Sequence, residues 1–547
     1  MRNFLYKTLR FAQGKCAFIL KDPCAHLVYN NFTFMSNIVK ILFDKKILFD
    51  RISLYILYCK GEMVEFKGKI LVIGCGSVSQ CAIPLILKLI DTPPKNITIM
   101  DFADNRLRVK DSLNKGVKYV IDRVTLQNYD TLLKKYVGRG DLIIDLAWNI
   151  DCIAMLQWCR DNRVLYVNTS VEVWDPYKKG VNTNPADMTL YVRQMEIREL
   201  IKKWGDNSGA TAIVDHGANP GLVSHFIKIA LEDIAKKIIS GKPKNKRIGI
   251  LKEALGNKYY PELAKSSGVK VIHISERDTQ ISDKPKQVDE FVNTWSIEGF
   301  FEEGIAPSEM GWGTHEKNIP EGACFHKSGP KNQICLESMG VNTWVHSWVP
   351  DCEIVGMVIR HGEAFGISDR LTVWDKKGKA VYRPTVHYAY CPCDAAINSL
   401  HELEMRRYNL QKNQRIMNNE IIKGEDRLGV LLMGHDFNSW WTGSLLGIEE
   451  ARKLVPNQNA TTLQVAISVV AAARWMIENP NKGFNLPDDM PHEDIMKIAK
   501  PYLGPFISKP VDWTPLKNYD KTFRTLGLKK SKPKDVWQFT TFLISQS

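Results

Sequence analysis

Carboxylates recur beside an aromatic residue in the middle of the chain. Glu276 follows the alternating run VIHIS, Trp295 ends the run VDEFVNTW, and Glu302 and Glu303 come soon afterwards. A ring face attracts an ammonium group by about 0.5–2 kcal/mol, and carboxylates add charge-assisted hydrogen bonds. This grouping predicts a trap for a cation. The alternative is that Trp295 is a core residue and that Glu298, Glu302 and Glu303 form a solvated face.

Three other polar residues stand at the ends of predicted elements or within them. Asn219 precedes a long helix with apolar residues at helical spacing, so it either caps that helix or turns its amide toward a ligand. Glu172 follows the strand predicted over 163–170, where a pocket acid and a loop acid are equally expected. His387 lies in the aromatic strand RPTVHYAY, where a lone histidine is usually a satisfied core residue.

A glycine-containing loop follows the first predicted strand, KILVI. It reads, in order, Gly74, Cys75, Gly76, Ser77, Val78 and Ser79. Gly74 makes the tight turn, and Gly76 lets the backbone approach a pyrophosphate at the start of the next helix. Asp101 ends the following strand, NITIMD, where an acid binds the ribose 2′-hydroxyl, so NAD is favoured over NADP. Ser79 replaces the third glycine of G-x-G-x-x-G, so the alternative is a Rossmann fold that has lost its cofactor site.

The elements that position these residues alternate between strand and helix. Further strands are predicted at 116–121, 141–148 and 163–170. This alternation predicts an α/β fold with a doubly wound, parallel Rossmann-type sheet, followed by a second α+β region. Ligands bind at the carboxyl ends of parallel strands. Asn149 and Thr169 fall there, so both are predicted on the nicotinamide side of the cofactor.

The chain divides into three predicted parts. Residues 1–62 carry ten Lys or Arg against four Asp or Glu and show no clean periodicity. We interpret them as a non-native or disordered extension ahead of Met63, and the alternative is a basic membrane anchor. Residues 63–215 form the predicted NAD-binding domain. Residues 216–547 form the substrate-binding and dimerisation region, with the helix predicted at 459–478 packing back onto the NAD-binding domain.

Composition narrows the class of protein. The chain has 547 residues, 44% hydrophobic, with 74 Lys or Arg against 60 Asp or Glu. This is the balance of a globular protein, and its basic excess comes without the aromatic-basic motif of a nucleic-acid binder, so neither nucleic acid nor membrane is predicted as a partner. Twelve scattered cysteines predict a reducing, cytoplasmic location. The pair Cys391 and Cys393 lacks a zinc-site spacing, so no metal is predicted.

Several longer motifs together carry a resemblance. In order they are GANPGLVSHF, HISERDTQ, FVNTWSIEGF, EMGWGTHE, YRPTVHYAYCPCDAA and NQNATTLQV. From about Lys67 onward the chain resembles the bacterial NAD-dependent homospermidine synthases, which are related to saccharopine dehydrogenase. The resemblance implies a homodimer that oxidises putrescine with bound NAD to an imine and releases ammonia. A second putrescine or related diamine then attacks, and the same NADH reduces the new imine to homospermidine.

The resemblance also implies roles for individual residues. Glu276 and Glu303 would hold amino groups and move protons, and Trp295 would face the cationic intermediate. The resemblance places three further polar groups near the nicotinamide and the substrate: Asn219, His387 and Glu172. Two other functions remain open. One is a carboxynorspermidine synthase or saccharopine dehydrogenase-like enzyme with net NAD(P)H turnover, and the other is an NAD-binding protein without catalysis.

Overall fold

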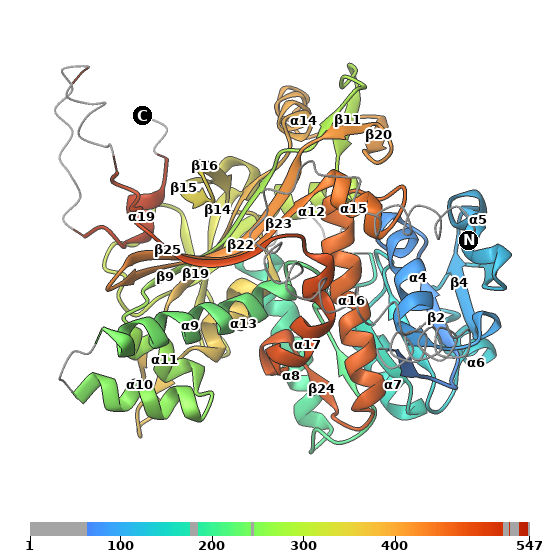
Figure 1. Ribbon diagram of the computed structural model, residues 1–547, viewed down its shortest axis with the longest axis horizontal. Coiled ribbons are helices and arrows are strands. Elements are labelled where there is room, and N and C mark those ends of the chain that lie inside the picture. Colours follow the sequence, from blue (N-terminus) through green and yellow to red (C-terminus); the bar gives the residue numbers. More distant parts are fainter. Residues whose placement is uncertain (1–62, 176–183, 242–245, 518–524, 526–534, 545–547) are drawn as a thin grey trace, which may run out of the picture. The chain divides into compact units, whose positions relative to one another are not determined.

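The computed structural model describes residues 63–175, 184–241, 246–517, 525 and 535–544 (Figure 1). The extension predicted over 1–62 lies outside the described residues. Residues 65–547 form one compact unit. All that follows concerns this unit, which holds every candidate site residue.

The first sheet is parallel and has seven strands in the order β24-β8-β7-β6-β2-β4-β5. Strands β2, β6 and β7 are buried along their whole length, as expected for hydrophobic runs covered on both faces. The predicted doubly wound α/β fold is confirmed. The strands are β2 (Ile70–Ile73), β4 (Ile97–Asp101), β5 (Lys118–Ile121), β6 (Leu142–Asp145), β7 (Leu165–Asn168), β8 (Ala212–Ile213) and β24 (Phe484–Asn485). The helices are α4 (Ser77–Leu89), α5 (Lys110–Asn114), α6 (Tyr129–Tyr136), α7 (Cys152–Asn162) and α8 (Leu190–Lys203).

The second sheet is mixed and has ten strands, in the order β13-β14-β12-β19-β9-β22-β23-β25, with the β15–β16 hairpin joined through β19. Only β9 and β19 run parallel to each other in it. Its strands are β9 (Val271–Asp278), β12 (Pro307–Gly311), β13 (Ala323–Phe325), β14 (Gln333–Met339), β15 (Trp344–Val349), β16 (Cys352–Met357), β19 (Thr385–Cys391), β22 (Glu425–His435), β23 (Asn438–Gly447) and β25 (Phe506–Val511). The helices of this region are α9 (Leu222–Ser240), α10 (Lys246–Gly256), α11 (Tyr260–Ser267), α12 (Ile297–Ile305), α13 (Gly362–Arg370), α14 (Asp394–Met405) and α19 (Phe539–Phe542).

Short two-stranded ladders lie outside these sheets. They include β10 (Ile281–Ser282) with β21 (Ile421–Lys423), β11 (Glu290–Asn293) with β20 (Asn413–Ile416), and β17 (Val373–Trp374) with β18 (Ala380–Tyr382). The parallel ladder β11–β20 leads directly to Trp295 and to α12. It therefore positions the aromatic and acidic residues that the sequence grouped together.

Helix α16 (Ala460–Glu478) returns from the second region to the first. It begins at Asn459, whose side chain accepts a hydrogen bond from the Thr462 N–H at 2.7 Å. It packs on α4, β6 and β7. The chain then adds β24 to the parallel sheet and continues into α17 (His492–Ala499). The sequence after residue 215 thus completes the first sheet, across the predicted domain boundary.

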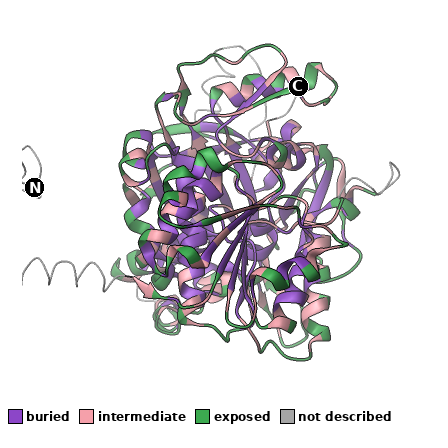
Figure 2. Cartoon of the chain, turned by 90° about the vertical axis from the view of Figure 1, so that its right-hand side faces the viewer, coloured by how far each residue is buried: buried purple, intermediate pink, exposed green. Residues whose placement is uncertain are grey.

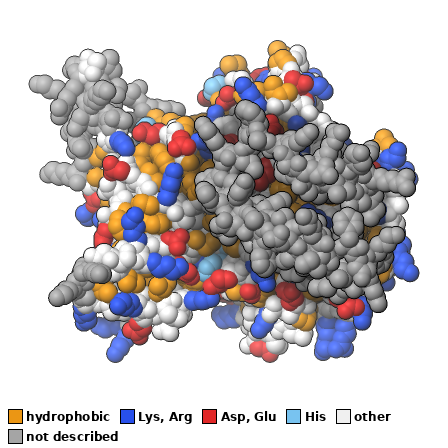
Figure 3. Space-filling view, in the orientation of Figure 1, with side chains coloured by type: hydrophobic (Ala, Val, Ile, Leu, Met, Phe, Trp, Pro, Cys, Tyr) orange, Lys and Arg blue, Asp and Glu red, His pale blue; other side chains and the backbone are white. Residues whose placement is uncertain are grey.

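Helix α16 is also the one helix among the described residues that is long and apolar enough to cross a membrane. Its apolar window is 83% buried inside the fold, and Figure 2 shows the buried residues, in purple, gathered in the interior. A core helix packed between two sheets accounts for this composition. On the part of the surface that Figure 3 leaves uncovered, Lys and Arg side chains are interspersed with acidic and hydrophobic ones.

Candidate active site

A cleft of about 220 Å³ lies between the carboxyl ends of the first sheet's strands and the edge of β9 and α12. It brings together residues that are far apart in the sequence. Seven of the predicted site residues line it, namely Val78, Thr169, Glu172, Asn219, Glu276, Trp295 and Glu303. One cleft therefore reaches from the start of α4 to the predicted cation trap.

The glycine loop has the geometry that the sequence predicted. Gly74 has φ +89°, and a Cβ there would lie 2.8 Å from the Leu146 carbonyl oxygen, so this turn requires glycine. Gly76 begins α4 without a side-chain cap, and no heavy atom lies within 4 Å of the place where its Cβ would be. The first N–H groups of the helix, at Ser77 and Val78, have no side-chain cap and so remain available to a ligand. This suits a pyrophosphate.

Asp101 lies at the end of β4, beside this loop. Its carboxylate accepts hydrogen bonds from the Cys75 N–H at 2.5 Å and the Ala103 N–H at 2.8 Å. These bonds fix the acid beside the glycine loop, with acceptor capacity remaining. Ser79, in place of the third glycine, is 1% exposed, and its hydroxyl has no partner among the described residues. The serine is therefore accommodated within the helix–strand contact, at the cost of one unpaired buried hydroxyl.

Asn149 does not take part in this cleft. It follows β6 with φ +64°, and its side-chain oxygen accepts a hydrogen bond from the Asp175 N–H at 2.6 Å. The predicted nicotinamide contact is therefore not supported. Asn149 holds its own loop, because a short amide side chain in a left-handed turn readily bonds to nearby backbone. The neighbouring Trp148 lines the cleft instead.

Glu276 is the most enclosed acid of the cleft, at 3% exposed. Its carboxylate accepts hydrogen bonds from the Asn219 side-chain amide at 2.8 Å and from the Tyr388 hydroxyl. Burial raises its pKa to about 7, although both hydrogen bonds act in the opposite direction. The amide of Asn219 therefore faces the cleft and not the helix end, since α9 begins at Leu222 after Gly221. Glu276 can exchange a proton near neutral pH.

Glu303 forms a chain of ionisable groups with the buried His361. The two ring nitrogens of His361 lie 3.1 Å from a Glu303 oxygen and 3.2 Å from a Glu363 oxygen. Burial lowers the pKa of His361, but Glu363 and Glu303 outweigh it, so that this pKa is raised well above the usual range. The imidazolium is therefore the dominant form at neutral pH, held between two carboxylates.

Glu302 is buried rather than solvated, at 6% exposed. Arg360 and Arg193 donate to its carboxylate at 2.5 and 3.1 Å, and the Trp148 indole donates at 3.0 Å. Burial raises its pKa, but the two arginines prevail and lower it. Glu302 therefore stays ionised and neutralises part of their charge. The solvated-face alternative fails for this residue.

Glu172 lies near this ion group and keeps one free oxygen. The other oxygen accepts from the Ser170 hydroxyl at 2.9 Å, while Oε2 is buried without a partner among the described residues. Burial, and next the charge of Glu302, raise the pKa of Glu172 to about 7. An unpaired buried carboxylate oxygen in a cleft is an acceptor available to a ligand.

Trp295 is half-buried at the cleft wall. Its indole N–H donates to the Tyr390 hydroxyl at 2.9 Å, and its ring lies 5.3 Å from that of Phe300. These contacts fix the ring plane of a residue that lines the cleft. Trp295 therefore has the rigid placement that a cation–π contact needs.

His387 lies outside the cleft, contrary to the prediction. Its ring is completely buried 4.2 Å from the ring of His273 and 5.3 Å from that of Phe539. Successive side chains of a strand point to opposite faces, so Tyr388 faces the cleft and His387 faces the core. Burial lowers the pKa of His387 to about 4, so it is a neutral core residue. A lone histidine in an aromatic strand is usually a core residue, and His387 is one.

Comparisons with known proteins agree with this geometry. The saccharopine dehydrogenase C-terminal domain matches residues 217–511, and the saccharopine dehydrogenase NADP binding domain matches residues 70–213. Homospermidine synthases of Mesorhizobium japonicum and Blastochloris viridis are 39% and 38% identical, each over 88% of this chain and over 97% and 98% of their own length. The chain belongs to the homospermidine synthase family. The crystal structure of the Legionella pneumophila homospermidine synthase in complex with NAD is 36% identical, with a TM-score of 0.78, over 89% of this chain and 100% of that one.

In this member of the homospermidine synthase family, sequence reasoning missed several cleft residues. They are Trp148, Arg193, Asp215, Arg360, His361 and Tyr388. Tyr388 had no signal in the sequence, because only the pairing of Tyr390 with Glu276 across the parallel strands shows which face of β19 the two tyrosines share. His361 and Arg360 come after β16, from a loop with no periodic pattern. Only the fold brings that loop beside α12.

Proposed function

We propose that this chain is an NAD-dependent homospermidine synthase. Putrescine would be oxidised to an imine with loss of ammonia, and the aminobutyl group would pass to a second putrescine or related diamine. The new imine would then be reduced to homospermidine, without net change of the cofactor. The observation that carries this proposal is the single cleft joining an uncapped glycine-loop helix to Glu276, Glu303 and Trp295.

The residues of the first sheet suit NAD. Gly76, Ser77 and Val78 would receive the pyrophosphate at the start of α4, and Asp101 would bind the ribose hydroxyls and repel a 2′-phosphate. When bound, NAD supplies the hydride acceptor and donor that the two redox steps need. The L. pneumophila relative contains NAD, which favours NAD over NADP here too.

The acids of the cleft suit a diamine whose two ends behave differently. The reacting amine must lose a proton before hydride leaves the adjacent carbon. Glu276, with its pKa raised to about 7, can take that proton. The distant ammonium would remain charged, held by Glu303, by the free oxygen of Glu172 and by the face of Trp295.

A carboxylated amine fits this cleft less well. Such a substrate, expected for a carboxynorspermidine synthase-like enzyme, needs an unpaired Arg or Lys for its carboxylate. Among the described residues, the cationic groups lining the cleft are Arg193, Arg360 and His361, and each is already bound to a carboxylate. With those cations paired, the unpaired oxygen of Glu172 favours a purely cationic substrate.

We also propose a homodimer in the cytoplasm. The nine cysteines of the described residues are all unbridged, which suits a reducing compartment. The dimer rests on the family resemblance, and light scattering of the purified chain tests it. A monomer mass would overturn that part of the proposal.

The deciding experiment is mass spectrometry of the purified chain incubated with putrescine and NAD, while absorbance is followed at the NADH band. Homospermidine and ammonia without lasting NADH are expected. NADH accumulation without homospermidine would indicate an amine dehydrogenase, and no reaction would favour the carboxylated-substrate enzyme or a non-catalytic NAD-binding protein. Replacing NAD by NADP in the same assay should give much slower turnover.

A further inference from the structure

Two cysteines face each other across an antiparallel ladder away from the cleft. Cys324 of β13 is paired directly with Cys335 of β14. Directly opposed residues of such a ladder have Cα atoms about 4.5–5.5 Å apart, within the range of about 4.4–6.8 Å found in disulfides. Opposed side chains also point to the same face of the sheet. The backbone therefore already places these thiols at bonding range.

The two thiols differ in their access to solvent. Cys335 is completely buried, and burial, followed by the neighbouring Cys324 thiol, raises its pKa to about 12. Cys324 is half-buried and its Sγ lies 3.8 Å from the Gly322 carbonyl oxygen. An oxidant from solvent would therefore reach Cys324 first, and Cys335 would complete the bond.

The same row of residues continues to an acid that holds α8. Glu309 of β12 is paired with Cys335 on the side opposite to Cys324. The Glu309 carboxylate is fully buried and accepts hydrogen bonds from the Leu190 and Tyr191 N–H groups at 2.8 and 3.3 Å. A carboxylate at a helix start satisfies free N–H groups and complements the helix dipole. Glu309 thus anchors α8 to the strand row that contains both cysteines.

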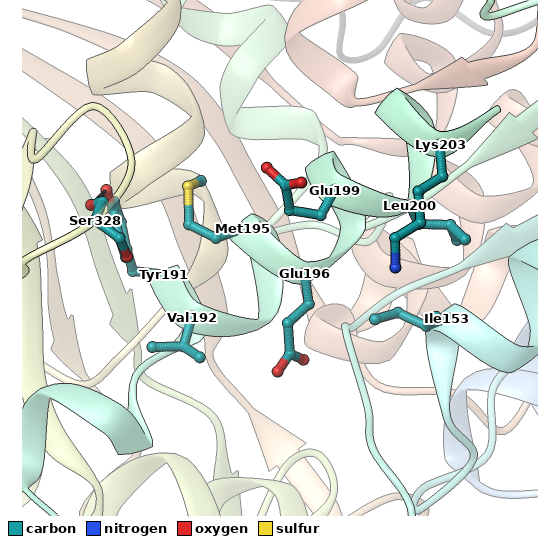
Figure 4. A pocket seen from close by; sticks show the side chains of 9 residues that line it. All are labelled: Ile153, Tyr191, Val192, Met195, Glu196, Glu199, Leu200, Lys203 and Ser328. Carbon is teal, nitrogen blue, oxygen red and sulfur yellow. Dashed lines mark hydrogen bonds between the residues drawn. The ribbon is translucent and has the colours of Figure 1, made fainter. Parts of the chain in front are cut away.

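A second contact joins the β13–β14 hairpin to α8. The Tyr191 hydroxyl donates to the Ser328 carbonyl oxygen at 2.7 Å, and its ring stacks on His326 with centroids 4.0 Å apart. Figure 4 shows Ser328 beside Tyr191, at one end of the row of α8 side chains that includes Met195. These side chains line a hollow of about 440 Å³. A shift of the hairpin would therefore be felt at the first turn of α8.

Helix α8 carries two residues that shape the substrate cleft. Arg193 binds Glu302 at 3.1 Å, and Gln194 donates to Asp215 at 2.7 Å. Both lie within one turn of the residues that Glu309 and Ser328 hold. Displacing the start of α8 would alter how much of the charge of Arg193 is neutralised beside the cleft, and so how the cleft holds a cation.

We propose that Cys324 and Cys335 form a reversible disulfide that weakens diamine binding through Glu309 and α8. The two thiols would lose two protons and two electrons to a small disulfide such as oxidised glutathione, which would be reduced to two thiols. The S–S bond would fix β13 and β14 to each other at the paired position, where the two cysteines already face each other. The effect on turnover rests on the proposed function, whereas the bond itself does not.

The test uses the full chain with NAD, treated with oxidised glutathione and then mapped as peptides by mass spectrometry. A bridge between the peptides of Cys324 and Cys335 is expected, together with a loss of putrescine affinity of roughly 10-fold, since small displacements at a site have effects up to about 10²-fold. Dithiothreitol should restore both. Cys324→Ser should keep normal activity when reduced and lose the response. The matched control Cys352→Ser removes an exposed thiol of β16 and should respond like the unaltered chain.

Each other result decides against the proposal. Two freely alkylated thiols after treatment would show that the bridge does not form. A mapped bridge with unchanged putrescine affinity, measured by calorimetry, would overturn the coupling to the cleft. A reduced chain that makes no homospermidine would contradict the proposed function alone, because the peptide map and the binding measurement do not depend on turnover.

Discussion

On strand β19, Tyr388 and His387 are neighbours in the sequence that lie in opposite environments. Tyr388 faces the cleft and donates to Glu276, whereas His387 faces the core between His273 and Phe539. On the cleft face, burial raises the pKa of Glu276 to about 7, and on the core face it lowers that of His387 to about 4. The carboxyl group on the cleft face can therefore exchange its proton near neutral pH, whereas the imidazole ring on the core face stays neutral. In this sheet the strand face, and not the residue type, decides which side chain can take part in chemistry.

The most severe test of this comparison is Glu276→Gln. The glutamine oxygen can still accept the hydrogen bonds from Asn219 and Tyr388, so the fold should be kept and the Tm should not fall. Loss of the base should lower kcat by roughly 10²–10⁴-fold. Initial rates of homospermidine formation and a thermal melt measure the two quantities. Glu298→Gln, which alters an exposed acid of α12, is the control and should keep its rate. A fully active Glu276→Gln variant would show that the carboxylate on the cleft face does not act as the base.

A smaller effect is expected at Trp295. Trp295→Ala removes the aromatic face and should lower kcat/KM for putrescine by about 10-fold, because a desolvated cation–π contact contributes about 2 kcal/mol. Trp295→Phe also loses the indole bond to Tyr390 but keeps a ring, so it should retain more activity. Steady-state assays of both variants decide the matter. Equal activity of the two variants would show that the ring acts only as packing.

Tyr388→Phe should act mainly through pH. The hydroxyl of Tyr388 lowers the pKa of Glu276, so removing it should raise that pKa further above about 7. The base works as the carboxylate, so activity is lost as pH falls through this pKa. The acid limb of the kcat/KM profile should therefore move to higher pH, with a several-fold loss near neutrality and recovery in alkali. Tyr390→Phe, which removes a hydroxyl with no hydrogen bond to Glu276, should leave the limb in place. If the acid limb of the kcat/KM profile did not move in Tyr388→Phe, Tyr388 would have no part in the proton transfer.

The parts of the fold set by local patterns could be predicted from the sequence. Buried β-branched runs give the parallel sheet, and a glycine turn before an apolar helix gives the phosphate loop with Gly74 and Asp101 where expected. Glu276 and Trp295 could be grouped because each lies at or near a strand end. These features depend on the period of two in a strand and on backbone turns, both of which are visible in a single segment.

The features that depend on register between distant segments could not be predicted. The Tyr390–Glu276 pairing decides which face of β19 borders the cleft, and it joins residues more than a hundred positions apart. The burial of Glu302 requires Arg360 to arrive from another loop, so an exposed acid and a paired one look alike in the sequence. Asn149 lies at the correct strand end, but its positive φ turns its amide to Asp175. The position of a residue in the sequence indicates at which edge of the sheet it lies. The direction of its side chain depends on packing, which the sequence does not show.

The smallest effect on activity is expected at His387, where the two faces can be separated by one substitution. His387→Phe should leave kcat/KM unchanged, because the ring borders Phe539 and His273 and not the cleft. It should nevertheless change how stability depends on pH. The folded pKa of about 4 lies below the usual value near 6.5, so the unfolded chain takes up a proton first as pH falls. The folded chain therefore loses stability from about pH 6.5 down toward pH 4, by about 1.4 kcal/mol for each unit of pKa difference.

Removing the titrating ring should make this acid destabilisation shallower, although the neighbouring His273, whose pKa burial also lowers, keeps part of it. Urea unfolding at several pH values between 7 and 5 measures the slope. The variant should differ little from the unaltered chain at pH 7 and should lose less stability at pH 5. If turnover fell while the pH dependence of stability stayed the same, His387 would act in the reaction. The position of a residue on one or the other face of β19 would then no longer explain why Tyr388 takes part.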